Sequence, residues 1–318
     1  MAKIVDPGSR YGRAQAVCVS RRWLVQSGLA AGISLSLAQS TSGQASPAEP
    51  VEGQVRSVDG TSISFLKLGR GPGLVYSHGS LSTGEEWLPV ADRLKDRFTS
   101  YVMTRRGRGR SDVGSSHSLE KECEDIAAVL GAAGPGAHLL GHSYGAVCAL
   151  ETARRTSIGK LVLYEPPLPM NRALTAGSGI PTFRADIEVF RAAIEEGRRE
   201  DAMLLGVRRF IGLTETEIAA LRPTPVWNEL LSFAHTWLPE LEALARLEYG
   251  VERFEEITAP TLLLVGALSP DHLKVASSAL QSTLPNARTV LLRDQGHEAQ
   301  VAVPDIVASE IARFAADA

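Results

Sequence analysis

The pentapeptide Gly141-His142-Ser143-Tyr144-Gly145 constrains this chain more than any other segment. It directly follows an apolar run at residues 137–140 and leads into a helical pattern at residues 144–154. A serine between two glycines at such a strand-to-helix turn stands on strained backbone, and its hydroxyl projects away from the sheet. The five residues alone would be a chance match. The predicted strand before them and the predicted helix after them are what indicate a reactive serine.

Apolar runs alternate with helical periods along most of the chain. Strands are predicted at residues 55–58, 62–67, 73–77, 100–104, 137–140, 160–164, 261–265 and 290–292. Helices are predicted at residues 87–94, 119–130, 144–154 and 306–314. The first two strands form a hairpin across Asp59-Gly60, a pair suited to a tight turn. The alternation predicts an α/β fold with a parallel sheet, helices on both faces and a site beyond the carboxyl ends of the strands.

The alternation is interrupted once, by about ninety residues between the strands at 160–164 and 261–265. Ordinary connections have about 2 to 6 residues, so residues 168–257 are predicted to form a helical lid inserted after the sixth strand. Helical patterns occur at residues 185–196, 201–210 and 227–247, and Thr214 and Glu217 have the spacing of a capping box.

Aromatic side chains in this segment are candidates for lining an apolar substrate pocket. The three that we single out are Trp227, Phe233 and Trp237. The ordinary alternative, that they pack the segment onto the core, accounts for most aromatic residues in such a position.

Residues 1–45 have the pattern of a twin-arginine export signal. Arg21-Arg22 precedes a weakly apolar, uncharged stretch, and Gly43-Gln44-Ala45 supplies the small residues of a cleavage site. The stretch is interrupted by polar residues and is shorter than the ~20 apolar residues of a membrane span. We expect the twin-arginine machinery to export the precursor, cleavage after Ala45, a periplasmic or secreted product, and no stable membrane span in the mature chain.

Removal of residues 1–45 changes the formal net charge from −3 to −7, because five basic residues and one acidic residue are lost. An acidic domain without a basic stripe does not suit nucleic acid or an anionic membrane. A small molecule is therefore the expected partner of residues 46–318, which are predicted to form one domain.

A serine hydroxyl is a weak nucleophile and needs a base to take its proton. Of the seven histidines, only His297, in Asp294-Gln295-Gly296-His297, follows the last strand at the edge where Ser143 lies. His297 is therefore the predicted base. The other six fit structural roles better, as side chains in core strands, in the lid or near helix starts.

The intermediate that follows attack on a carbonyl carries an oxyanion, which needs hydrogen-bond donors. The backbone N–H of Tyr144, directly after the nucleophile, is one predicted donor. The other is the N–H of Ser80, in Ser77-His78-Gly79-Ser80, where Gly79 permits close approach of the backbone.

These motifs resemble the lid-bearing α/β-hydrolases over about residues 50–316. The resemblance rests on His78-Gly79, Arg106-Gly107-Arg108-Gly109-Arg110-Ser111, Gly141 to Gly145, Tyr164-Glu165-Pro166-Pro167 and Gly296-His297. It implies a mostly parallel, eight-stranded sheet, and it implies that the arginine-rich loop is structural rather than an anion site.

The family's usual acid position is occupied here by Ser269, which cannot carry the charge that stabilises an imidazolium. Two carboxylates could replace it. Glu165 ends the strand after the nucleophile's helix, a position from which some members of the family supply the acid. Asp271 lies two residues beyond the usual position, where its ordinary role is to cap a helix. We favour Glu165, with Asp271 as the alternative.

Ser143, His297 and Glu165 predict a serine hydrolase that cleaves a carboxylic ester or lactone through an acyl-enzyme, with no metal and no organic cofactor. The resemblance leaves open carbon–carbon bond hydrolysis and cofactor-free haloperoxidase or perhydrolase chemistry on the same scaffold. A binding protein that kept the fold without turnover is the alternative from another class, although binding alone does not need these residues together.

Overall fold

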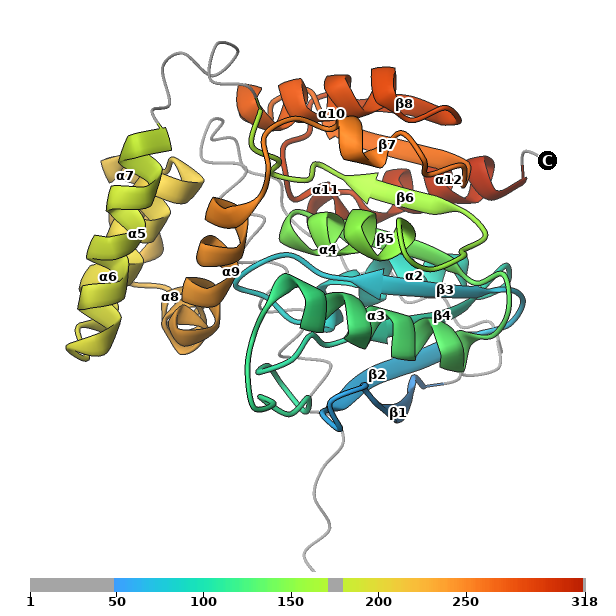
Figure 1. Ribbon diagram of the computed structural model, residues 1–318, viewed down its shortest axis with the longest axis horizontal. Coiled ribbons are helices and arrows are strands. Elements are labelled where there is room, and N and C mark those ends of the chain that lie inside the picture. Colours follow the sequence, from blue (N-terminus) through green and yellow to red (C-terminus); the bar gives the residue numbers. More distant parts are fainter. Residues whose placement is uncertain (1–48, 171–179, 317–318) are drawn as a thin grey trace, which may run out of the picture.

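The computed structural model describes residues 49–170 and 180–316 (Figure 1). The predicted export signal at residues 1–45 lies outside the described residues, as do residues 171–179 of the predicted lid. None of the helices in the described ranges is long and apolar enough to cross a membrane.

Eight strands form one sheet in the order β1-β2-β4-β3-β5-β6-β7-β8. Their bounds are β1 Val51–Arg56, β2 Ser62–Gly69, β3 Gly73–Ser77, β4 Thr99–Met103, β5 His138–His142, β6 Leu161–Tyr164, β7 Thr261–Gly266 and β8 Ala287–Leu292. Strand β2 runs antiparallel to both of its neighbours, whereas strands β3 to β8 are parallel. The predicted eight-stranded, mostly parallel α/β sheet is confirmed.

Helices cover both faces of the sheet (Figure 1). Those of the core are α2 Leu88–Leu94, α3 Leu119–Ala133, α4 Tyr144–Ala153, α10 Asp271–Thr283, α11 Ala299–Ala302 and α12 Pro304–Ala316. Side chains alternate between two hydrophobic clusters along each central strand. Val75 belongs to the cluster of α3, α4 and α10, whereas Leu74 and Tyr76 belong to that of α2 and α12. Burial on both faces explains why these strands are continuous apolar runs.

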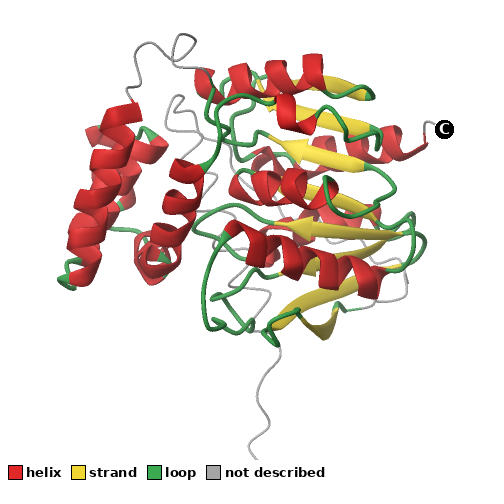
Figure 2. Cartoon of the chain, in the orientation of Figure 1, coloured by secondary structure: helices red, strands yellow, loops and turns green. Residues whose placement is uncertain are grey.

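A helical insertion, residues 180–246, lies between β6 and β7 in the chain. Its elements are α5 Ile180–Glu195, α6 Arg199–Gly206, the π-helical turn η2 Val207–Ile211, α7 Glu215–Leu221, α8 Pro225–Ser232 and α9 Ala234–Arg246. It lies beside the end of the sheet toward which the parallel strands point (Figure 2). It has its own hydrophobic cluster, which includes Phe190, Trp227 and Trp237 and is joined by Leu81 from the loop after β3.

Several predicted boundaries are wrong, and two of them have a clear physical reason. The predicted helix at residues 227–247 is two helices, α8 and α9, that meet at Phe233. Both helices bury apolar side chains in the same cluster, so the apolar period runs through the junction and does not reveal it. The first strand is Val51–Arg56 rather than residues 55–58, because a hydrogen-bonded turn from Ser57 to Thr61 ends it at Arg56. Its side chains are mostly exposed and gave no apolar signal.

Candidate active site

Ser143 lies at the turn between β5 and α4, with φ 53° and ψ −126°. Its neighbours explain the two flanking glycines. A Cβ on Gly145 would lie 2.3 Å from the carbonyl oxygens of Ser77 and His78, and one on Gly141 would lie 2.5 Å from the Cα of Ala146. Strand β3 and helix α4 thus approach too closely for any side chain, and Ser143 is held at the end of the sheet.

The loop after β3 lies against Ser143. A Cβ on Gly79 would lie 3.2 Å from the Cβ of Ser143, and Ser80 follows Gly79 directly. Tyr144 is the first residue of α4, where backbone N–H groups have no partner within the helix. The structure therefore brings both predicted oxyanion segments to the serine.

His297 lies in the segment after β8 and faces Glu165. Its Nδ1 lies 2.5 Å from the Glu165 Oε2. The Glu165 side chain is completely buried and the His297 side chain is one quarter exposed. An imidazole that donates from Nδ1 to a carboxylate keeps Nε2 unprotonated, which is the form that a general base needs.

Glu165 follows β6 and adopts a positive φ of 48°. Its second carboxylate oxygen, Oε1, accepts a hydrogen bond of 2.7 Å from the Gly266 N–H at the end of β7. Burial raises the pKa of Glu165, but the hydrogen bond and charge of His297, together with hydrogen bonds from Ser269 and the Gly266 N–H, outweigh burial and lower the pKa below its ordinary value. The carboxylate is therefore ionised when it faces the imidazole.

Asp271 does not reach His297, whereas Ser269 lies beside the Glu165 carboxylate, whose pKa its side chain helps to lower. The Asp271 side chain is 95% exposed at the start of α10, where it pairs with Lys274 at 3.0 Å. Pro270 occupies the N-cap position, so Asp271 is the first residue of the helix and not its cap. Ser269 is buried in the loop after β7. Of the two predicted acids, the structure brings Glu165 to His297 and leaves Asp271 in solvent.

His142 supports His297, a contact that the sequence did not predict. The ring centroids are 4.6 Å apart, and the His142 Nε2 donates to the His297 carbonyl oxygen at 2.9 Å. Tyr164 donates its hydroxyl proton to the Gly296 carbonyl and accepts from the Ala299 N–H at 3.1 Å. The signal that could have found them was their position at the ends of β5 and β6, one place before Ser143 and Glu165 respectively.

The predicted substrate-binding aromatics have different surroundings. Trp227 and Trp237 are buried in the cluster of the insertion, where the Trp237 ring packs against Phe190 and Phe210. Phe233 is only partly buried, at the junction of α8 and α9, with the Arg108 guanidinium 6.0 Å from its ring centroid. Packing accounts for the two tryptophans, and contact of any of the three with substrate stays a prediction.

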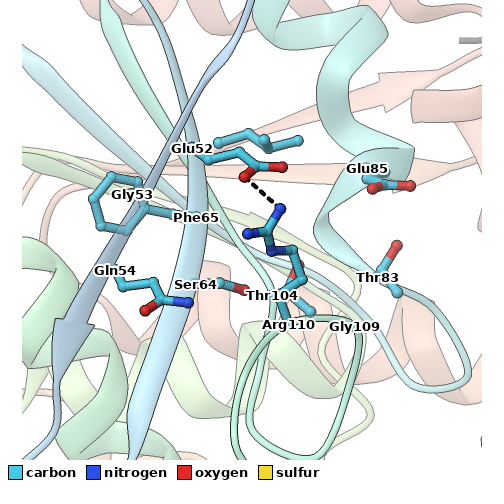
Figure 3. A pocket seen from close by; sticks show the side chains of 11 residues that line it. Glu52, Gly53, Gln54, Ser64, Phe65, Thr83, Glu85, Thr104, Gly109 and Arg110 are labelled. Carbon is cyan, nitrogen blue, oxygen red and sulfur yellow. Dashed lines mark ion pairs between the residues drawn. The ribbon is translucent and has the colours of Figure 1, made fainter. Parts of the chain in front are cut away.

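A pocket of about 390 Å³ opens elsewhere, beside β1 and β2. Its lining includes Glu52 and Arg110, which form an ion pair, and Phe65, Thr83 and Glu85 (Figure 3). It contains none of the predicted catalytic residues. In the described ranges, no three His, Cys, Asp or Glu side chains gather as they would around a metal ion.

An eight-stranded, mostly parallel sheet with a serine on a strained strand-to-helix turn is the architecture of an α/β hydrolase. Comparison with known proteins agrees, and the chain belongs to the alpha/beta hydrolase family, whose model matches residues 74–310. The structure of an α/β hydrolase from Sphaerobacter thermophilus is 34% identical, with a TM-score of 0.73 over 82% of this chain and 99% of that chain.

Two curated relatives have stated activities. A pimeloyl-[acyl-carrier protein] methyl ester esterase of Aeromonas hydrophila is 26% identical over 261 residues, which are 76% of this chain and 95% of the esterase. An N-formylmaleamate deformylase of Pseudomonas putida is 36% identical over 118 residues. That match spans 35% of this chain and 44% of the deformylase, less than half of its length.

Proposed function

We propose that this protein is a serine hydrolase that cleaves a carboxylic ester or lactone through an acyl-enzyme. The observation that carries the proposal is the 2.5 Å contact between the His297 Nδ1 and the buried Glu165 carboxylate, at the end of the sheet where Ser143 stands on strained backbone. A buried acid that orients a histidine near a half-buried serine at a turn is the arrangement that activates a hydroxyl.

In this mechanism the Ser143 Oγ attacks the carbonyl carbon while the His297 Nε2 takes its proton. The ionised Glu165 stabilises the imidazolium that results. The N–H groups of Tyr144 and Ser80 hold the oxyanion, and one such donor is worth about 2.7 to 4 kcal/mol. The imidazolium then protonates the departing alkoxide. A water molecule, deprotonated by His297, releases the acid and restores the serine.

The similarities support an acyl-transfer reaction. One curated relative is a methyl ester esterase and another is a deformylase. We propose the helical insertion as a lid over the site, and residues 1–45 as an export signal that makes the mature protein periplasmic or secreted.

The direct test is hydrolysis of short-chain aryl esters, alkyl esters and lactones by the purified protein and by Ser143→Ala. We expect turnover on at least one ester or lactone, and a loss of roughly 10⁴-fold or more in kcat for Ser143→Ala. Folded wild-type protein without turnover on the whole panel, or an active Ser143→Ala variant, would contradict the proposal.

A further inference from the structure

The carbonyl oxygen of Gly79, in the loop beside Ser143, is held by three side chains. The His78 Nδ1 lies 2.8 Å from it, an Arg105 Nη2 lies 3.1 Å from it, and the Ser82 hydroxyl donates to it at 3.3 Å. In a planar trans peptide the C=O of one residue and the N–H of the next point in opposite directions. The donors that fix the Gly79 carbonyl therefore also fix the direction of the Ser80 N–H.

His78 is a fixed part of this arrangement. Its Nε2 accepts a hydrogen bond of 3.1 Å from the Arg105 N–H, so the ring proton is on Nδ1 and is donated to Gly79. Burial and the charges of Arg105 and Arg108 hold the pKa of His78 well below its ordinary value. The ring is therefore neutral, and Arg105 contributes the charged donor to Gly79.

Arg105 connects the loop to three other parts of the molecule. Its side chain is completely buried. Its Nη1 donates to the Glu122 Oε1 on α3 at 3.0 Å, and its Nη2 donates to the Glu240 Oε1 on α9. The guanidinium carbon lies 4.8 Å from the ring centroid of Tyr144, the residue after the nucleophile. One guanidinium thus touches both predicted oxyanion segments and a helix of the insertion.

Glu240 is the only described carboxylate that pairs with Arg108 and is one of two that pair with Arg105. Its side chain is completely buried, and the Arg108 Nη2 lies 2.5 Å from the same oxygen that Arg105 contacts. A buried charge that loses its partner is strongly unfavourable. Without this carboxylate on α9, Arg108 would have no partner among the described carboxylates and Arg105 would keep only Glu122, so the orientation of Arg105 toward Gly79 would be less well fixed. Leu81 strengthens the link, because it packs into the hydrophobic cluster of the insertion two residues from Gly79.

We propose that Glu240 and Arg105 are positioning residues that couple the contact of α9 with the core to the direction of the Ser80 N–H. Neither residue touches the reacting atoms. The helical insertion then helps to fix the direction of the Ser80 N–H, in addition to any contacts that it makes with substrate. This inference rests on the proposed serine hydrolase function.

The test compares Glu240→Gln with Glu242→Gln, a matched control two residues along α9. Glu242 pairs with Arg191 and Arg246 at 3.1 and 3.2 Å and does not contact Arg105. Hydrogen exchange of the backbone amides at residues 77–84 reports on the loop without any need for activity. We expect exchange about tenfold faster in Glu240→Gln and unchanged in Glu242→Gln.

Kinetics provide the second measurement. On the best ester of the panel, we expect Glu240→Gln to lower kcat about tenfold, less than complete loss of an oxyanion donor, with KM little changed. The affinity for an aryl trifluoromethyl ketone, whose adduct with the serine carries an oxyanion, should fall in the same proportion. A variant that had lost only stability would not lose kcat and affinity for the ketone in the same proportion.

A second variant separates stability from positioning. Adding Arg108→Gln to Glu240→Gln removes the arginine that would be left without a carboxylate, so we expect the Tm to recover. Loop exchange and kcat should stay as in Glu240→Gln, because Arg105 still lacks its partner on α9.

Recovery of kcat together with the Tm would overturn the inference, as would equal behaviour of Glu240→Gln and Glu242→Gln in both measurements. Wild-type protein without ester or lactone turnover would instead overturn the proposed function, whatever the exchange of the loop.

Discussion

Four residues other than glycine have a positive φ in the described part of the chain: Leu81, Ser143, Glu165 and Asp294, at 54°, 53°, 48° and 57°. Each lies in a loop of the candidate site, after β3, β5, β6 and β8 respectively. Such a conformation costs of order 1 to 3 kcal/mol for a residue with a side chain. Strain gathered in the four loops that meet at one end of the sheet is typical of a functional site.

At the same scale, the acid that faces His297 can be identified by two neutral substitutions. Glu165→Gln keeps the size of the side chain but removes the charge that stabilises the imidazolium, so kcat should fall about 10²- to 10⁴-fold. Asp271→Asn changes an exposed carboxylate that pairs only with Lys274 among the described residues, and activity should stay within about twofold. Full activity in the first variant and collapse in the second would reverse the assignment.

Close packing around the turn predicts a difference between two glycines. Gly145→Ala places a Cβ 2.3 Å from two carbonyl oxygens and should lower the free energy of unfolding by about 1 to 3 kcal/mol. Gly131→Ala, on α3 with nothing within 4 Å of the added Cβ, should raise it by about 0.5 to 1 kcal/mol. Urea unfolding measures both, and a Gly145→Ala variant as stable as wild type would show that the turn has more room than its contacts indicate.

At the scale of elements, Glu122 connects α3 to the loop after β4. Burial raises the pKa of Glu122, but the charge of Arg105 and the hydrogen bond of His117 outweigh it and bring the pKa to about 2. A carboxyl whose pKa is lower in the folded protein stabilises it above the unfolded pKa, and this contribution is lost as the pH falls. Ionised Glu122 therefore stabilises the fold above about pH 4.5, and the effect fades toward pH 2.

Urea unfolding between pH 5 and pH 3 measures this contribution. We expect the wild-type free energy of unfolding to fall across that range, and Glu122→Gln to remove about 2 kcal/mol of the fall. Glu122→Gln should also be less stable than wild type at pH 7, because Arg105 and His117 lose a charged partner. Equal slopes for the two proteins would show that Glu122 is not ionised through its contact with Arg105.

The sequence predicts the central elements well because their signals are local. The Gly141 to Gly145 turn, the strand that ends before Glu165 and the segment that carries His297 are each set by an apolar run and the residues that follow it. The ion pairs of Arg105 were out of reach, because Glu240 is 135 residues away in the chain and lies on a helix whose start the apolar period does not show. Glu165 could be preferred over Asp271 only on resemblance and on the expected capping role of Asp271, because the buried contact with His297 is a tertiary feature.

At the scale of the whole molecule, the sheet and the insertion meet where the candidate site lies. Glu165 directly follows β6, before the chain enters the segment that contains the insertion, and Arg105 and Arg108, after β4, pair with Glu240 on α9. Buried ion pairs therefore join the insertion to the loop after β4, beside the candidate site.

The proposed export signal makes a prediction for the whole chain. In a bacterial host with twin-arginine machinery, the protein should reach the periplasm and lose about 45 residues. Arg21→Lys with Arg22→Lys should hold the full-length chain in the cytoplasm, whereas the control Arg10→Lys with Arg13→Lys should not. Cell fractionation and intact mass distinguish these cases. Equal export of both double variants would contradict the twin-arginine assignment.

The central claim is that Ser143 is a nucleophile activated by His297 and Glu165. The most direct measurement is reaction of the purified protein with a fluorophosphonate, followed by mass spectrometry of its peptides. We predict one adduct, on Ser143, that is absent in Ser143→Ala and forms at least about 10²-fold more slowly in Glu165→Gln. Folded wild-type protein that forms no adduct, or an adduct on another residue that persists in Ser143→Ala, would contradict the account.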